Sequence, residues 1–318
     1  MRKLKSPVAV VWEITNNCNF MCPHCRAYMA PSEDENAIEE RILSEIIKND
    51  VISVNLSGGE PLLNKRVTEL VNRLSERNID VGISSNGWLF EQKSEELIKN
   101  GLCFLQVSVD GTREQHDKFR GVEGAFDRAI NALRIARKYG IRTQMNVTIT
   151  SQNLNTLMYN IELAKKLDID RIFFRRVVPV GKGDVNRYVL PEKEKYLKTI
   201  TKISKLQIPN LDIAIDDPIL TVMKKESEIE LNSIGCTAGI KSLGISSKGD
   251  VYPCIFLREK LGNITEMDLA QIWDNSKLLK KLRNRDIGKC GACKYKFICG
   301  GCRAFSGIDN KDEMCPFD

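Results

Sequence analysis

The chain has 318 residues, of which 42% are hydrophobic and 28% charged, and its formal net charge is +6. No stretch approaches the roughly 20 apolar residues of a membrane span, and the apolar run at residues 8–12 is too short for a signal peptide. We therefore expect a cytoplasmic protein. The scattered basic residues give little support to nucleic-acid binding. Eleven cysteines, without an oxidising compartment, favour metal ligands over disulfides.

Short β-branched runs alternate with amphipathic segments through the first half of the chain. The runs predict strands over residues 8–14, 51–56, 80–85, 104–109, 142–149 and 171–175. The segments predict helices over residues 38–48, 65–77, 91–99, 125–139 and 154–167. This alternation predicts an α/β fold with a parallel sheet. Six units make a partial (β/α)6 TIM-like barrel, since a full barrel takes about 250 residues.

Three cysteines follow the first predicted strand with the spacing C-x3-C-x2-C, namely Cys18, Cys22 and Cys25. Three thiolates in one loop can hold three irons of a 4Fe–4S cube and leave the fourth iron open to a substrate or cofactor. Structural zinc is the alternative, but it usually takes four ligands in two spaced pairs. The triplet therefore favours a catalytic iron–sulfur site.

The next three predicted strands each end in a glycine-containing turn. Gly58-Gly59-Glu60-Pro61 follows the second strand, Asn86-Gly87 the third and Asp110-Gly111 the fourth. Paired glycines let the backbone approach a ligand closely, and a glutamate can accept from an ammonium group. Ordinary turns are the alternative for each dipeptide. Because the carboxyl ends of parallel strands meet at one edge, we expect these turns and the triplet to form one site.

The alternation stops near residue 187. A helix is predicted over residues 190–206, a pair of strands over 243–246 and 250–252 joined by the turn 247–249, and a helix over 269–283. We expect a barrel domain over residues 1–215, a linker over 216–235 and a small cysteine-rich domain over 236–318. This last domain holds Cys236, Cys254, Cys290, Cys293, Cys299, Cys302 and Cys315.

Two cysteine patterns need separate interpretation. Cys290, Cys293, Cys299 and Cys302 form two C-x2-C pairs that, by themselves, would fit a zinc ribbon. Cys103 lies apart from the others, at the start of the fourth predicted strand, and free cysteines behave as small buried hydrophobes. We predict that Cys103 is a core residue.

The triplet and Gly58-Gly59-Glu60, in this order at the ends of strands one and two, resemble the radical S-adenosylmethionine (radical SAM) superfamily over about residues 8–215. The seven last cysteines resemble the SPASM domain, an auxiliary iron–sulfur domain, over about residues 230–318. Gly249-Asp250-Val251-Tyr252-Pro253-Cys254 and Cys299-Gly300-Gly301-Cys302-Arg303 agree with this resemblance.

The resemblance implies a partial (β/α)6 barrel in which SAM binds the open iron of the triplet cluster. One electron cleaves SAM, and the resulting 5′-deoxyadenosyl radical abstracts a hydrogen atom from the substrate. Glu60 would bind the amino group of SAM and Arg120 its carboxylate. A solvated cation or an ion pair with Asp117 is the alternative for Arg120. The implied cofactor-binding residues are Gly58, Gly59, Glu60, Ser84, Asn86, Asp110 and Arg120. No catalytic side chain is predicted.

Two further residues near the triplet have predicted positions. His24 is expected to pack beside the adenine pocket. Glu13, on the first strand, is expected to point into the barrel, with a surface ion pair as its alternative.

A SPASM domain implies two auxiliary 4Fe–4S clusters. Cys290, Cys293, Cys299 and Cys315 would hold the outer one, and Cys236, Cys254 and Cys302 the inner one, nearer SAM. The chain departs from the common pattern because its last pair is C-x2-C, where C-x3-C is usual, and because no cysteine closely follows Cys236. The inner cluster then has three evident ligands, with an open iron or a non-cysteine ligand as its fourth.

The auxiliary clusters imply a net oxidation. The first prediction is maturation of a ribosomally made peptide (RiPP), by crosslinking or side-chain oxidation under anaerobic conditions. The alternatives are decarboxylation of tetrapyrrole propionates in a haem pathway, and a non-enzymatic iron–sulfur electron carrier or sensor. Expected partners are a flavodoxin- or ferredoxin-type electron donor and, for a peptide, a separate leader-binding protein. Substrate carboxylates are expected at Arg175, Arg176, Lys182 and Arg187, with a solvated face as the alternative.

Overall fold

The computed structural model describes residues 4–26, 36–182, 189–223 and 235–317, and within them one sheet has ten strands in the order β10-β9-β8-β1-β2-β3-β4-β5-β6-β7. From β1 to β7 every neighbouring pair is parallel. These strands are β1 (Ala9–Thr15), β2 (Ser53–Gly58), β3 (Asp80–Ser85), β4 (Leu102–Ser108), β5 (Arg142–Ile149), β6 (Arg171–Arg176) and β7 (Asp212–Ile215).

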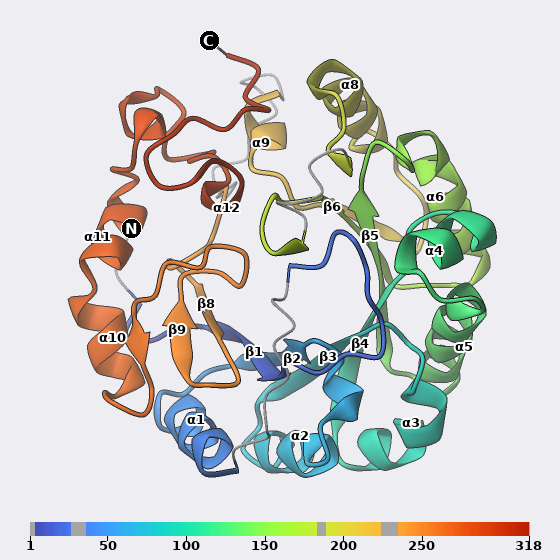
Figure 1. Cartoon of the computed structure of the whole chain (residues 1–318), viewed down its shortest axis with the longest axis horizontal. Coiled ribbons are helices and arrows are strands. Elements are labelled where there is room, and N and C mark those ends of the chain that lie inside the picture. The colour runs from blue at the N-terminus through green and yellow to red at the C-terminus, as the bar shows by residue number, and fades with distance from the viewer. Residues whose placement is uncertain (1–3, 27–35, 183–188, 224–234, 318) are drawn as a thin grey trace.

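The helices that follow the strands lie around the outer face of the curved sheet (Figure 1). They are α1 (Asn36–Lys48), α2 (Val67–Ser75), α3 (Phe90–Lys99), α4 (Arg113–Arg120), α5 (Ala125–Lys138), α6 (Leu157–Lys166) and α8 (Lys193–Ile203). This arrangement confirms the predicted partial barrel. No helix in the described ranges is long and apolar enough to span a membrane.

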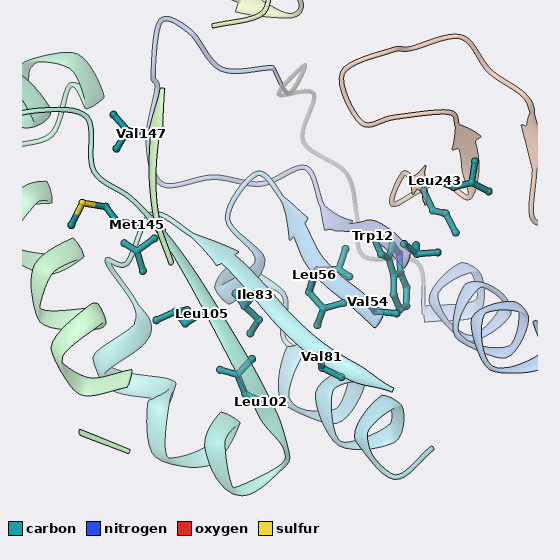
Figure 2. Packing of buried hydrophobic residues seen from close by; sticks show 14 of the residues in the cluster. Trp12, Val54, Leu56, Val81, Ile83, Leu102, Leu105, Met145, Val147 and Leu243 are labelled. Atoms are coloured by element: carbon teal, nitrogen blue, oxygen red, sulfur yellow. The ribbon is translucent and has the colours of Figure 1, made fainter. Parts of the chain in front are cut away.

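The two faces of the sheet differ in polarity because side chains alternate along each strand. Leu56, Ile83, Leu105 and Val147 point outward and are fully or almost fully buried (Figure 2). Burial of each such side chain stabilises the fold by about 1.5–3 kcal/mol.

The inner face instead carries amides and hydroxyls. Asn55 donates to Ser84 Oγ at 2.8 Å, and Gln106 and Asn146 extend the ladder at 3.1 Å each. The interior of the barrel is therefore a polar surface that can face a ligand.

The strands over residues 80–85, 142–149 and 250–252 coincide with their predictions, and the other predicted strands shift by one or two residues. Several elements of the described ranges were not predicted, among them α4 and β7. The helix predicted over residues 269–283 is divided into α10 (Leu269–Asn275) and α11 (Lys277–Asn284). Ser276 separates them because its side chain accepts from Leu279 N and so caps α11.

The cysteine-rich part continues the sheet of the barrel. Strand β8 (Ser242–Ile245) pairs in parallel with β1, and β9 (Asp250–Tyr252) forms the predicted hairpin with β8. The short strand β10 (Gly262–Asn263) closes this end of the sheet. Helix α9 (Ile219–Met223) lies within the predicted linker, whose residues 224–234 fall outside the described ranges. The division at residues 216–235 stays a prediction.

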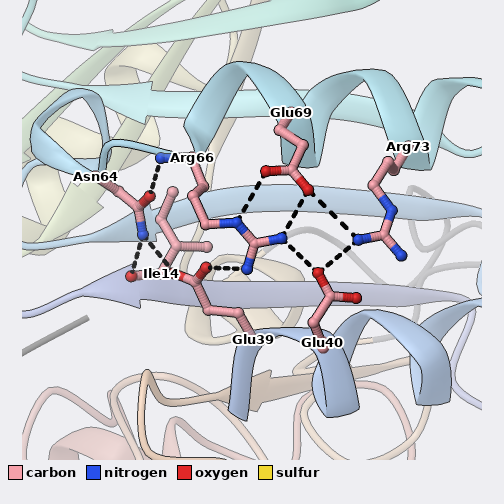
Figure 3. A network of polar contacts seen from close by, with 7 residues as sticks. All are labelled: Ile14, Glu39, Glu40, Asn64, Arg66, Glu69 and Arg73. Carbon is pink, nitrogen blue, oxygen red and sulfur yellow. Dashed lines mark hydrogen bonds and ion pairs between the residues drawn. The ribbon is translucent and has the colours of Figure 1, made fainter. Parts of the chain in front are cut away.

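A polar network fixes the end of β1, from which the cysteine triplet departs (Figure 3). Asn64 donates to the carbonyl of Ile14 at 2.8 Å and to the Glu39 carboxylate at 2.6 Å. Arg66 pairs with Glu39 at 3.1 Å and Glu69 at 2.7 Å, which joins α1 to α2. Residues of α1 and of the start of α2 therefore fix the position of the end of β1.

Candidate active site

The triplet loop leaves β1 at the carboxyl edge of the sheet and packs into a small apolar cluster with Phe20, Ala125 and Trp88. Burial raises the pKa of Cys18 to about 11 and also raises the pKa of Cys22. Both are therefore protonated thiols in the metal-free protein, and binding of iron has to displace those protons. Three cysteines in one partly buried loop suit an iron–sulfur cluster, and their role as its ligands stays a prediction.

The backbone of the Gly58-Gly59-Glu60 segment is hydrogen-bonded to the end of β1 and to the loop that leads to the triplet. Gly59 N donates to Thr15 O and Glu60 N to Asn17 O, both at 2.8 Å. A Cβ on Gly58 would overlap Thr15 O, and one on Gly59 would overlap Asn17 O. The glycines were expected to make room for a ligand. The described neighbours show that they also make room for the chain that carries the cysteines, and their contact with SAM stays a prediction.

Glu60 is buried, with 1% of its surface exposed, and its carboxylate accepts three hydrogen bonds. The donors are Leu62 N at 3.1 Å, and Ser85 Oγ and Asn86 N at 2.8 Å. Burial nevertheless raises the pKa of Glu60 to about 7. The Glu60 carboxylate also adds to the effect of burial in raising the pKa of Cys18, so the two groups interact electrostatically.

The other predicted SAM-binding residues lie at the same edge but have partners within the chain. Asn86 Nδ2 donates to Asn19 in the triplet loop at 2.8 Å, and Ser84 belongs to the polar ladder of the interior. Asp110 is buried, pairs with Arg120, and accepts from Thr148 N at 2.8 Å. Their contacts with SAM stay predictions.

Arg120 is buried and lies against the triplet. Its Nε donates to Asp110 at 2.8 Å, and its Nη1 lies 3.8 Å from Cys22 Sγ. Both alternatives for this residue are wrong, because the side chain is not solvated and Asp117 instead accepts from Gly124 N and Phe126 N. A role with the SAM carboxylate stays a prediction.

His24 is buried and stacks on Phe119, with 4.2 Å between the ring centroids. Burial and the nearby Arg120 charge lower the pKa of His24 to about 3, so the imidazole is neutral at physiological pH. A neutral flat ring is suited to packing rather than to proton transfer.

Glu13 points into the barrel, as expected, and joins the triplet loop to the cysteine-rich part. It pairs with Arg26, which directly follows Cys25, and with Arg258 at 2.7 Å. Burial alone would raise the pKa of Glu13, but the two guanidinium groups outweigh it and hold the pKa below its usual value. The sequence interpretation missed both arginines. The position of Arg26 beside Cys25 was the one available signal.

A cavity of about 340 Å³ lies between β1, β6 and the cysteine-rich part, and Cys236, Cys254 and Cys302 line it. Burial raises the pKa of Cys236 to about 11 and that of Cys302 to about 12. We call this the inner site. Arg175 and Phe256 line it as well.

A second, narrower cavity of about 30 Å³ is lined by the remaining four cysteines, Cys290, Cys293, Cys299 and Cys315. We call this the outer site. No three histidine, cysteine or acidic side chains in the described ranges converge closely enough for a single metal ion. Cysteines spread around a cavity fit a cluster, which has an iron at each corner for a separate thiolate. The cysteines that line each cavity are those that the resemblance assigned to each cluster, and their role as ligands stays a prediction.

The four cations that were expected to bind substrate carboxylates differ in burial and in their partners. Arg175 is half-buried at the inner site, pairs with Asp216 at 2.6 Å and lies 4.4 Å from the Phe256 ring. Arg176 is buried and paired with Asp312 and Asp217, so it holds the fold together and is not free for a substrate. Lys182 N donates to Cys25 O, and Arg187 lies outside the described residues.

Cys103 is not a core residue, contrary to the prediction. It is half-buried, donates to Val81 O at 3.2 Å and lies 3.6 Å from an Arg142 amine. It is the second residue of β4, at the amino ends of the parallel strands and opposite to the triplet, so its neighbours are strand-end polar groups.

The Radical SAM superfamily model matches residues 12–164, and the SPASM model, an iron-sulfur cluster-binding domain, matches residues 236–296. The AdoMet-dependent heme synthase of Methanosarcina barkeri is 33% identical, covering 94% of this chain and 92% of that protein. The mycofactocin maturase MftC of Mycolicibacterium smegmatis is 29% identical, covering 99% and 84%. Streptococcus suis SuiB bound to S-adenosylmethionine superposes with a TM-score of 0.75 at 23% identity, covering 99% of this chain and 78% of that chain.

The two family models include the triplet in the barrel and four of the seven later cysteines, and the 33% identical relative spans both parts. SAM and iron–sulfur clusters are the cofactors that these matches support, while the number of auxiliary clusters stays a prediction. The chain belongs to the radical SAM superfamily and carries a C-terminal SPASM domain, as its motifs predicted.

Proposed function

We propose that this radical SAM enzyme oxidatively decarboxylates the propionate side chains of a tetrapyrrole, the haem-pathway alternative stated above. The observation that carries the proposal is a group of three arginines near the inner site. Arg26 and Arg175 lie 5.5 and 4.4 Å from the Phe256 ring centroid, and Arg258 is joined to Arg26 through Glu13. Guanidinium groups bind carboxylates through two parallel hydrogen bonds.

The three arginines carry one positive charge more than the two carboxylates that pair with them, Glu13 and Asp216. The Methanosarcina barkeri relative, named for haem synthesis, spans both parts of the chain. Together these observations favour a substrate with several carboxylates over a neutral one.

The proposed decarboxylation balances when the substrate loses one electron in addition to one hydrogen atom and CO₂. When bound, SAM and the triplet cluster supply a 5′-deoxyadenosyl radical that takes one hydrogen atom from a propionate. Loss of the carboxylate as CO₂ and of one electron would then leave a vinyl group, and the cysteines of an auxiliary site would hold a cluster able to accept that electron. The chain's own residues would hold the other carboxylates and position the reacting side chain between the triplet and the inner site.

A peptide substrate, the first prediction from the motifs, is the second candidate. The mycofactocin maturase matches 99% of this chain, and an acidic peptide could use the same arginines. The two classes are separated by their products rather than by SAM cleavage, which both share.

The experiment is anaerobic incubation of the cluster-loaded protein with SAM, dithionite and a propionate-bearing iron porphyrin. We expect one 5′-deoxyadenosine for each propionate that loses CO₂ and two hydrogen atoms. Mass spectrometry of the porphyrin measures this loss. The esterified porphyrin is the control and should stay unchanged. Formation of 5′-deoxyadenosine with every propionate intact would contradict the tetrapyrrole, and conversion of a precursor peptide encoded nearby would then favour the peptide.

Arg175→Met is expected to weaken substrate binding without affecting SAM cleavage. A hydrogen bond to a charged group contributes about 1.5–3 kcal/mol, so KM should rise ~10- to 100-fold. Arg171→Met is the matched control, because Arg171 lies on the same strand and pairs with Asp212 as Arg175 pairs with Asp216, both at 2.6 Å. Equal KM values for the two variants would argue against a substrate role for Arg175.

We also propose that Glu60 accepts from the amino group of SAM, which requires the ionised carboxylate. Because the pKa of Glu60 is raised to about 7, SAM affinity should be constant above this pH and fall as the pH decreases through it. Well below pH 7 the loss approaches about tenfold per pH unit. Anaerobic equilibrium dialysis between pH 6 and 8 measures it. Glu60→Gln should bind weakly with a flat profile; a flat profile in the native protein would contradict the proposal.

A further inference from the structure

Arg303 directly follows Cys302, and its guanidinium group reaches the outer site. The residue is 3% exposed. Its Nη2 lies 3.0 Å from Cys290 Sγ, and its Nη1 donates to Asn310 O at 2.9 Å. Within the described ranges no carboxylate pairs with Arg303, although a buried charge without a partner is costly. The arrangement points to an anion at the outer site, and a thiolate-bound cluster is anionic.

Gly301 provides the room for this contact. It has a φ of +64°, and a Cβ there would overlap Arg303 Nη2 and lie 3.1 Å from Cys290 Sγ. Gly300, beside it, makes the same kind of room for Arg285. Arg285, however, donates to the carbonyl of Cys236 at 2.7 Å and not to a sulfur. The two glycines thus admit two arginines, of which only Arg303 donates to a cysteine sulfur.

The inner and outer sites are closely connected. Cys236 N, from the inner site, donates to the carbonyl of Cys299, from the outer site, at 3.3 Å. Cys299 and Cys302 are also joined by the Gly300-Gly301 dipeptide. Arg176 lies near Cys302 and lowers its pKa against the effect of burial, but Asp217 and Asp312 pair with Arg176. At the outer site, Arg303 has no such carboxylate partner in the described ranges.

We propose that Arg303 directs electron flow from the inner to the outer site by stabilising the reduced state of a cluster at the outer site. A hydrogen bond to a ligand sulfur and a nearby positive charge both favour the added electron. The electron released by the substrate then moves outward instead of returning to it. This rests on the proposed function only in needing both auxiliary clusters, and the redox test below uses no substrate.

The test is an anaerobic redox titration of the cluster-loaded protein, followed by electron paramagnetic resonance. The resonance signal of the cluster at the outer site is identified as the one that is absent from the Cys293→Ser variant. In Arg303→Met its reduced form should become at least tenfold less stable, a downward shift of about 59 mV for one electron, at unchanged iron content. Gly301→Ala should shift it in the same direction by displacing the guanidinium, and Arg303→Lys should shift it less.

The control is Arg283→Met, because Arg283 donates only to the carbonyls of Gly239 and Trp273 and should leave the potential unchanged. Three results would overturn the proposal: an unchanged outer potential in Arg303→Met, a shift of the inner signal instead, or loss of iron in both the Met and Lys variants. The last would make Arg303 a folding residue. Failure of the proposed function would look different, since potentials would shift as expected while porphyrins stayed intact.

Discussion

Replacing Cys22 by alanine is expected to abolish 5′-deoxyadenosine formation and to remove about four irons per chain. Cys22 is 6% exposed, lies between Cys18 and Cys25 in a loop fixed to Gly59 and Glu60, and has no neighbouring cysteine to replace it. A two-thiolate loop holds too few irons to keep a cluster. The measurements are iron analysis and chromatography after anaerobic incubation with SAM and dithionite.

Cys103→Ala is the matched control, because Cys103 lies at the opposite edge of the sheet and lines neither cysteine cavity. It should keep the native iron content and native SAM cleavage. Retention of more than a few per cent of SAM cleavage by Cys22→Ala, at reduced iron content, would show that the triplet is not where SAM is cleaved.

The strands of the barrel could be predicted because outward-facing aliphatic residues alternate with inward-facing polar ones. β3 and β5 have this pattern over most of their length and were predicted to the residue. α4 was missed because Arg113–Arg120 is almost entirely polar. Its only local signal is the capping box of Thr112 and Gln115.

The motifs identified the chemistry, but the partners of individual side chains were not predictable. The sequence offered Asp117, three residues away, as an ion-pair partner for Arg120. In the folded chain Arg120 instead lies against Asp110 and Cys22. Arg258 meets Glu13 across 245 residues of chain. The Glu13–Arg258 pair depends on where the SPASM part continues the barrel sheet, and spacing along the chain does not encode that.

Arg176→Met is expected to destabilise the cluster-loaded protein by about 3–5 kcal/mol, the cost of leaving a buried charge unpaired. Arg176 is 2% exposed and joins β6 to the C-terminal segment through Asp312 at 2.9 Å, and to Asp217 at 3.0 Å. Its guanidinium also lies 4.0 Å from the Phe305 ring centroid. Urea denaturation measures the free energy of unfolding.

Arg171→Met again serves as the control, since the exposed Arg171–Asp212 pair should contribute at most about 1 kcal/mol. The triple variant Arg176→Met, Asp217→Asn, Asp312→Asn tests the cause. If unpaired carboxylates produce the loss, neutralising them should recover part of it. Asp312 also accepts hydrogen bonds from Cys302 N and Met314 N. If the triple variant is less stable than Arg176→Met alone, these hydrogen bonds, and not the charge of Asp312, hold the outer site against the barrel.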